Sequence, residues 1–146
     1  MKPVGFILVI ALALGLTACG GTSSRVQAVQ VETTEFKFSP NSITVAPGER
    51  VTFKFTNKGA LEHEFMAGRG ATPSKGYTED WIAKAGAATA PHTHPGETHS
   101  GQGVRVPADW YATLTVVVPD GRGVYEFGCF VQGHYEAGMK GTLVVR

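Results

Sequence analysis

Residues 125–145 read YEFGCFVQGHYEAGMKGTLVV and divide into a short strand, a loop and a second strand. In the first part, Tyr125, Phe127 and Cys129 fall on alternate positions, and a period of two is typical of a strand with one buried face. The loop then brings His134 and Met139 at successive five-residue steps after the cysteine. A thiol, an imidazole and a thioether within one loop predict a metal site between the last two strands of a sheet.

The same alternation recurs along most of the chain. It is clearest in VTFKFT at 51–56, and turn sequences such as APGE at 46–49 and PDGRG at 119–123 separate the alternating segments. The segments that carry the pattern are 29–38, 42–45, 51–56, 63–66, 111–118, 124–129 and 140–146. Seven or eight short strands in about 120 residues predict an all-β fold, an antiparallel β-sandwich of two sheets.

Residues 68–103 break this rhythm, because they are rich in Gly, Ala, Pro, Thr and His and have few strong apolar positions. The length exceeds an ordinary connection, so we expect an irregular insertion that is functional or mobile. Residues 79–88 are predicted to form a helical turn or two around Trp81 and Ile82.

Three histidines within eight residues of this insertion are a candidate second metal site for Cu(II) or Zn(II), and they are His92, His94 and His99. The adjacent Pro91, Pro95 and Gly96 impose no fixed geometry, so an exposed polar loop is the favoured interpretation.

The N-terminus predicts a secretory signal peptide over residues 1–18. Lys2 precedes an apolar run at 4–16, and this run is too short to span a bilayer comfortably. LTAC at 16–19 resembles the lipobox of bacterial lipoproteins, in which the cysteine is acylated and becomes the mature N-terminus. We therefore expect lipid on Cys19 and a protein anchored to a bacterial membrane, facing the periplasm or the cell exterior.

Lipidation of Cys19 leaves Cys129 as a single thiol in an exported protein, where thiols normally pair, so it needs a role such as metal binding. Residues 19–27 would form a flexible tether and 28–146 one domain. Removal of Lys2 with the signal leaves twelve basic residues against twelve acidic ones. A chain so close to neutral gives no support to a nucleic-acid partner.

A fourth donor completes the constellation. His63 lies on a predicted strand far upstream of Cys129, His134 and Met139. Two imidazoles, one thiolate and a distant thioether are the donor set of a mononuclear blue-copper, or type 1, site. Thiolate and thioether favour Cu(I), whereas imidazole accommodates Cu(II), so such a site suits the transfer of one electron.

Other interpretations of these residues explain less. Each donor taken singly could be an ordinary core or loop residue. Cys129 and His134 could act as a nucleophile and its base, but this leaves His63 and Met139 without a role. A binuclear copper centre would need a second nearby cysteine. Met66 is expected to be a core residue and not an alternative axial donor.

The run at 125–145 is similar to the C-terminal signature of the cupredoxins, with the C-x4-H-x4-M spacing of the rusticyanin and auracyanin branch. The similarity extends to TVAPGERVTFKFTN at 44–57 and LEHEF at 61–65. The resemblance implies a Greek-key β-sandwich and one copper ion, with these ligands: His63, Cys129, His134 and Met139. One position departs from the family, because Glu64 stands where an asparagine commonly braces the cysteine loop. An ionised carboxylate there would favour Cu(II) and lower the reduction potential.

The resemblance also implies a function: an electron carrier between membrane-associated redox partners, monomeric, and not an enzyme. In cupredoxins the C-terminal histidine ligand, here His134, reaches the surface and gives the electron a short exit. Its apolar neighbours form a candidate docking patch for weak, transient contacts, namely Phe130, Val131, Tyr135 and Ala137. We expect no small-molecule substrate.

A different class of function is copper binding, delivery or resistance, with the histidine-rich loop acquiring the metal. Reversible electron cycling with copper retained would favour the first function, and ready transfer of copper to an acceptor would favour the second. A copper enzyme with an open coordination position is a third hypothesis, which the axial Met139 opposes.

Overall fold

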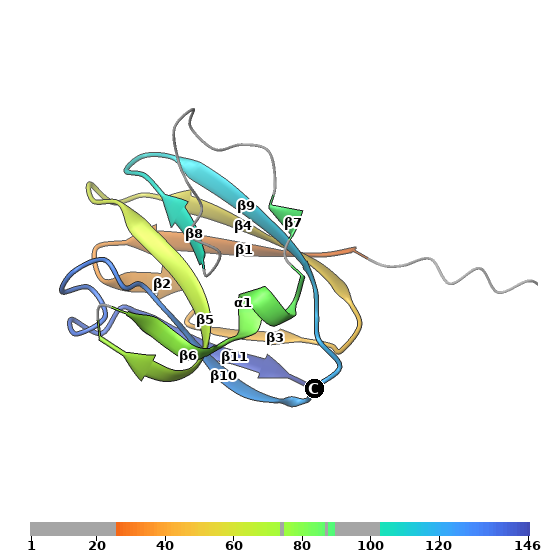
Figure 1. Cartoon of the computed structure of the whole chain (residues 1–146). Helices are drawn as coiled ribbons and strands as arrows, with labels where there is room; N and C mark the ends of the chain where they lie inside the picture. The colour runs from red at the N-terminus through yellow and green to blue at the C-terminus, as the bar shows by residue number, and fades with distance from the viewer. Residues whose placement is uncertain (1–25, 74, 87, 90–102) are drawn as a thin grey trace, which may run out of the picture.

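The computed structural model describes residues 26–73, 75–86, 88–89 and 103–146, which form two facing β-sheets (Figure 1). The first sheet has the strand order β2-β1-β4-β9-β7. Its strands are β1 (Val26–Thr34), β2 (Lys37–Ser39), β4 (Arg50–Asn57), β7 (Ala88–Thr89) and β9 (Tyr111–Val117).

The second sheet has the order β3-β11-β10-β5-β6, and β8 also pairs with β5. Its strands are β3 (Ser42–Val45), β5 (His63–Thr72), β6 (Gly76–Asp80), β8 (Gly103–Val106), β10 (Gly123–Gly128) and β11 (Lys140–Val145). A single turn of helix, α1 (Trp81–Lys84), follows β6, and the Asp80 carboxylate caps it by accepting from the Ala83 N–H. The predicted all-β sandwich is confirmed, and so is the helical turn around Trp81.

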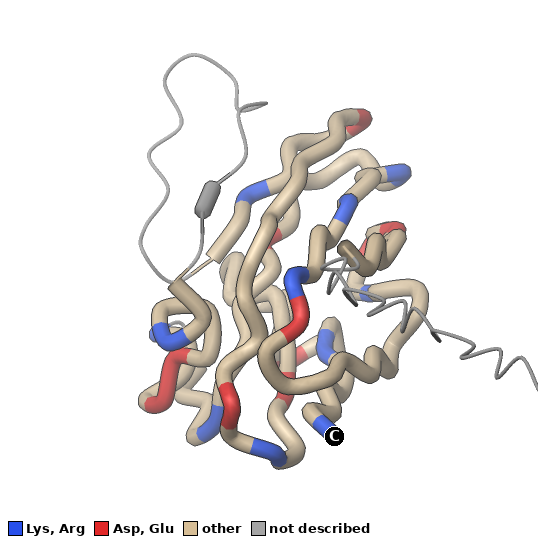
Figure 2. Tube along the Cα trace, turned by 90° about the vertical axis from the view of Figure 1, so that its right-hand side faces the viewer, with Lys and Arg blue, Asp and Glu red and all other residues tan. Residues whose placement is uncertain are grey.

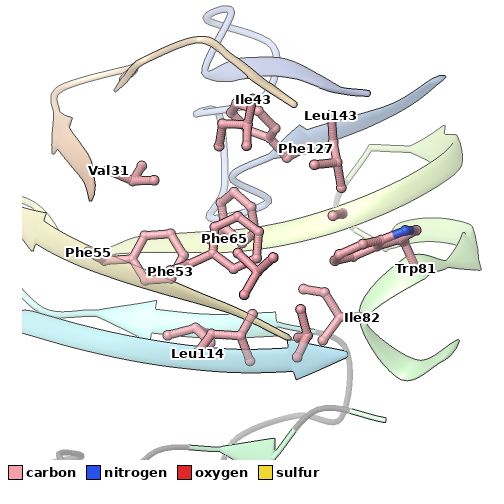
Figure 3. Packing of buried hydrophobic residues seen from close by; sticks show 14 of the residues in the cluster. Val31, Ile43, Phe53, Phe55, Phe65, Trp81, Ile82, Leu114, Phe127 and Leu143 are labelled. Carbon is pink, nitrogen blue, oxygen red and sulfur yellow. The ribbon is translucent and has the colours of Figure 1, made fainter. Parts of the chain in front are cut away.

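The core between the sheets follows from the alternation in the sequence. In β4, Val51, Phe53 and Phe55 are buried while Arg50 and Lys54 are exposed, because successive side chains of a strand point to opposite faces. Phenylalanines from both sheets meet in the middle of the sandwich, as Figure 3 shows. Each large apolar side chain that leaves water contributes about 1.5–3 kcal/mol to folding, so this cluster is the main stabilising feature.

Strand pairing differs in one respect from the expected antiparallel sandwich. β1 runs parallel to β4, with Val31 opposite Phe55, and β3 runs parallel to β11, with Ile43 opposite Leu143. Both sheets are therefore mixed, and the described residues contain eleven strands, more than the seven or eight expected. A period of two shows which face of a strand is buried but not which strand lies beside it, so the parallel pairs were not predictable from pattern alone.

The described part of residues 68–103 is more regular than the sequence suggested. β5 continues to Thr72 and turns back into β6, so the start of the supposed insertion is a hairpin of the second sheet. The close approach of these two strands requires Gly68, because a Cβ there would lie 2.1 Å from the Glu79 carbonyl oxygen. Small residues thus allowed tight pairing here and did not signal a loop.

Several predictions fall outside the described residues. They concern the signal peptide at 1–18, Cys19 and its tether, and the candidate second site at His92, His94 and His99. Within the part of the chain that the structure describes, no helix is long and apolar enough to cross a membrane.

Four connections gather at one end of the sandwich, on the left in Figure 1: β1–β2, β4–β5, β8–β9 and β10–β11. β1 begins at the opposite end, where the chain also finishes. Residues that lie far apart in the sequence therefore come together at this one end, which carries the candidate site.

Candidate metal centre

Three of the predicted donors lie together at this end. His63 begins β5, Cys129 follows β10, and His134 lies in the β10–β11 loop. Nδ1 of His134 is 3.3 Å from Nδ1 of His63 and 3.4 Å from Sγ of Cys129. Among the described residues, these three form the only group of His, Cys, Asp or Glu side chains found close enough to share a metal ion, and all three are buried.

The two separations from His134 fit a site in which three donors surround one metal ion, and all three donor atoms lie within 4.8 Å of one another. Metal–nitrogen bonds of about 2.0–2.1 Å and a metal–sulfur bond of about 2.3 Å place donors in one plane about 3.5–3.8 Å apart, close to the separations given above. The Nε2 atom of His63 is buried without a hydrogen-bond partner among the described residues. The His63 nitrogen that faces the other donors is Nδ1, which lies 3.3 Å from Nδ1 of His134.

The β10–β11 loop is folded by its own backbone. The N–H of Cys129 donates to the Met139 carbonyl oxygen, and the N–H of Met139 donates to that of His134. Gly133 and Gly138 have φ values of 82° and 96°, a conformation that glycine adopts without steric cost. Met139 is fully buried at the end of this loop. The backbone of the loop therefore holds a thiol and an imidazole in fixed positions.

Asn57 braces the other side of the site. Its Nδ2 group lies 2.7 Å from the Leu61 carbonyl oxygen and 3.0 Å from those of Val106 and Pro107, and its Oδ1 accepts from the Gly59 N–H. This one side chain ties the β4–β5 loop, which leads into His63, to the end of β8. Nothing in the local sequence pattern marked Asn57 beyond its place in a turn.

Glu64 touches the site through its backbone and through its carboxylate, which the Phe130 N–H of the cysteine loop stabilises. Its backbone N–H donates to Sγ of Cys129 at 3.3 Å. Its carboxylate is buried opposite Arg105 on β8, whose Nε lies 3.9 Å away, while Nη1 of Arg105 donates to Glu62. Burial raises the pKa of Glu64, and the Arg105 charge opposes that rise. The departure from the family pattern is thus accompanied by a cation on the neighbouring strand.

Burial also sets the protonation of the donors. It raises the pKa of the Cys129 thiol, against the lowering effect of the Glu64 and Val131 backbone N–H groups. Burial, followed by the neighbouring His134, lowers the pKa of His63. At neutral pH the metal-free site therefore holds a thiol and a neutral His63 imidazole. A metal ion that binds here must displace the thiol proton.

The predicted docking patch lies on the outer side of the β10–β11 loop. Phe130 stacks on Tyr135 with a centroid separation of 4.8 Å, and both are partly buried, as is Val131, whereas Ala137 is exposed. The Tyr135 hydroxyl donates to the Glu126 carboxylate at 2.6 Å, and the Tyr77 hydroxyl donates to the same oxygen. Part of the predicted patch thus serves to fasten the loop to the sheet.

Sequence reasoning missed one aromatic neighbour of the site. Phe36, in the β1–β2 connection, lies edge-on against His134 with ring centroids 5.1 Å apart, and 43% of its surface is exposed. His134 itself is only 5% exposed. The positions that bring Phe36 to His134 are almost a hundred residues apart, so no local pattern pointed to this contact.

Comparison with known proteins agrees with this geometry. A family model described as a cupredoxin-like domain matches residues 5–73. Together with the β-sandwich and the His-Cys-His cluster, this match defines a cupredoxin-like domain, and its cofactor is copper.

Two relatives share a name, "copper-resistant cuproprotein CopI". The protein from Rubrivivax gelatinosus is 36% identical over 110 residues, which cover 75% of this chain and 60% of that protein. The protein from Pseudomonas aeruginosa is 28% identical over 152 residues, covering 92% of this chain and 83% of its own length. The chain thus spans about three fifths of the Rubrivivax relative.

Among solved structures, auracyanin A, a "blue" copper protein from Chloroflexus aurantiacus, aligns with a TM-score of 0.57 at 22% identity and covers 84% of this chain and 100% of its own. Auracyanin from Roseiflexus castenholzii gives the same score and identity, with coverages of 86% and 99%. These similarities establish the fold.

Proposed function

We propose that the protein is a mononuclear type 1 copper protein that transfers single electrons outside the cytoplasm. The observation that carries the proposal is the buried cluster of His63, Cys129 and His134, whose donor atoms all lie within 4.8 Å of one another. Met139, fully buried at the end of the same loop, would hold the copper through its thioether as a fourth donor. Bound copper supplies a centre that cycles between Cu(I) and Cu(II).

The protein's own contribution is rigidity and the exclusion of water. Backbone hydrogen bonds hold Cys129 and Met139, Asn57 holds the approach to His63, and none of the donor residues is more than 5% exposed. A site whose donors need little movement suits electron transfer, because both oxidation states use the same positions. Burial of all the donors also supports a carrier without catalytic activity.

Weak and transient redox partners fit the surface near His134. Phe36, Phe130 and Val131 offer partly exposed apolar area there. Acidic and basic residues are interspersed along the trace in Figure 2 and do not separate by sign. This favours apolar docking of a monomer over strong electrostatic steering.

Copper handling is the second candidate function, and the shared name of the two relatives is what favours it. A protein that acquires and delivers copper must release it to an acceptor, whereas an electron carrier retains it. The histidine-rich loop with His92, His94 and His99 would then act in metal acquisition.

We further propose that the protein is exported and anchored through lipid on Cys19. β1 begins at Val26, at the end opposite the metal centre, and its nine residues span about 30 Å. The residues between Cys19 and β1 can reach at most about 25 Å. An anchor there would direct the metal end away from the membrane. Cys19→Ser should move the protein from the membrane fraction to the soluble fraction, and unchanged membrane association would contradict the anchor.

The test of the main proposal is the visible and EPR spectrum of the Cu(II)-loaded protein. We expect an intense thiolate-to-copper charge-transfer band and a narrow copper hyperfine splitting, both lost in Cys129→Ser. Copper should stay bound through repeated reduction and oxidation. An ordinary Cu(II) spectrum that survives Cys129→Ser and disappears when His92, His94 and His99 are replaced by alanine would instead establish copper handling through the loop.

A further inference from the structure

Phe36 has a backbone conformation that its side chain disfavours. Its φ is 62°, in the left-handed region, where a bulky residue is a genuine outlier and Gly or Asn is the usual choice. It occupies one of the two positions between β1 and β2, whose register pairs Thr34 with Lys37. Two-residue hairpin connections normally carry Asn-Gly or Asp-Gly, so a phenylalanine here indicates a role that outweighs local preference.

The strained conformation directs the ring onto His134. The two rings meet edge to face, at an interplanar angle of 88°. His134 is buried although Gln132, Gly133 and Glu136 in its own loop are exposed. Nδ1 of His134 faces the other two donors, so Phe36 is a side chain from outside the loop that covers the imidazole.

Glu35 fastens the same connection to the loop that leads into His63. Its carboxylate accepts the Ala60 N–H and packs against Gly59, where a Cβ would lie 2.6 Å from Oε1. This hydrogen bond is the largest cause of a lowered Glu35 pKa, so the carboxylate is ionised at neutral pH. The connection therefore contacts both histidine-bearing segments.

We propose that Phe36, held in place by Glu35, is a shield over His134 that restricts the access of water, small ligands and copper chelators to the metal end of the protein. The proposal rests on the proposed copper site for its biological meaning. The contact between Phe36 and the His134 imidazole is made by the chain itself, so it can be tested without copper. A shield that slows copper exchange would favour retention of the metal, and so the electron carrier over the delivery protein.

The first experiment uses the metal-free protein. Diethyl pyrocarbonate acylates accessible imidazoles, and mass spectrometry of peptides reports each histidine separately. Because an aromatic pair of this kind stabilises the covered state modestly, we expect Phe36→Gly to increase the acylation rate of His134 by about two- to tenfold. Phe36→Tyr keeps a ring in place and should leave the rate near that of the wild type. Val124→Ala, at a residue 60% exposed on β10, is the control for loss of exposed apolar area.

Glu35→Ala provides an independent arm, because it removes the fastening and keeps the ring. It should also speed acylation of His134. The proposal is overturned by an unchanged His134 rate in Phe36→Gly, or by an equal rise at His63, which would mean general loosening of the site.

The second experiment uses the Cu(I)-loaded protein and a coloured Cu(I) chelator. Release should accelerate in Phe36→Gly by a factor similar to that seen for acylation, and an unchanged release rate would refute the effect on exchange. Failure of the blue-copper assignment would show separately, as an ordinary copper spectrum in the wild type, while the acylation result would still decide whether Phe36 shields His134.

Discussion

Replacement of Asn57 by alanine should destabilise the metal-free protein more than a typical polar substitution, because one buried side chain serves four backbone groups. Its amide has two hydrogens for three carbonyl acceptors, and its oxygen accepts one N–H. At most two full donated bonds and one accepted bond are therefore lost. Each contributes about 0.5–1.5 kcal/mol, and buried carbonyls left unpaired add to the cost. We expect a loss of about 3–4 kcal/mol in the free energy of unfolding, a large part of the 5–15 kcal/mol typical of a domain.

Asn57→Asp is the matched variant, since it keeps the size and the acceptor for the Gly59 N–H but replaces the donor by a carboxylate oxygen facing three carbonyls. These dipoles disfavour the ionised form and should raise the folded-state pKa of the new carboxyl above the unfolded value of about 3.9. The free energy of unfolding of Asn57→Asp then falls furthest below that of the wild type at pH values above the folded-state pKa of the new carboxyl. This difference shrinks as pH falls from the folded-state pKa towards the unfolded-state pKa, because the protonated carboxyl can donate a hydrogen bond again.

Urea unfolding of the metal-free proteins between pH 4.5 and 8, followed by fluorescence, measures both effects. A free energy of unfolding for Asn57→Ala within about 1 kcal/mol of the wild-type value, the contribution expected of a single hydrogen bond, would contradict this prediction. The reasoning also fails if the difference between Asn57→Asp and the wild type does not change with pH.

Three further predictions concern the site and the sheet. Apparent Cu(II) affinity should rise about tenfold per pH unit while the Cys129 thiol remains protonated, because burial raises the pKa of this thiol and metal binding releases its proton. Isothermal titration in two buffers of different ionisation enthalpy would measure the released proton, and a pH-independent affinity would contradict the prediction. Glu64→Gln should raise the reduction potential at pH 8 by tens of millivolts, because a unit charge contributes about 1–2 kcal/mol at a separation on the order of 10 Å and an effective dielectric constant of about 20. A redox titration that shows no rise would refute this. Gly141→Ala should cost about 1–3 kcal/mol, because its Cβ would lie 2.3 Å from the Phe127 ring, whereas Gly121→Ala meets nothing closer than 3.7 Å; equal stability of the two variants in urea would contradict the steric argument.

Short-range patterns in the sequence were enough to predict the sandwich and to select the donors that meet at its end. Alternation in 51–56 shows the buried face of β4 directly, since a strand repeats every two residues. The spacing from Cys129 to His134 selects two donors within one short loop, and the preceding strand fixes where that loop starts. These features are local, and local geometry is what a sequence specifies most directly.

Contacts between distant segments were decided only by the tertiary structure. The parallel pairing of β1 with β4, the continuation of β5 to Thr72, and the contact of Phe36 with His134 all depend on which elements become neighbours. Asn57 looked like an ordinary turn residue, but three carbonyl groups from two separate segments converge on it in the structure. Periodicity in a sequence indicates which residues are buried, but it does not indicate which distant segment packs over them. The metal centre is surrounded by side chains from such distant segments, so only the tertiary structure shows them.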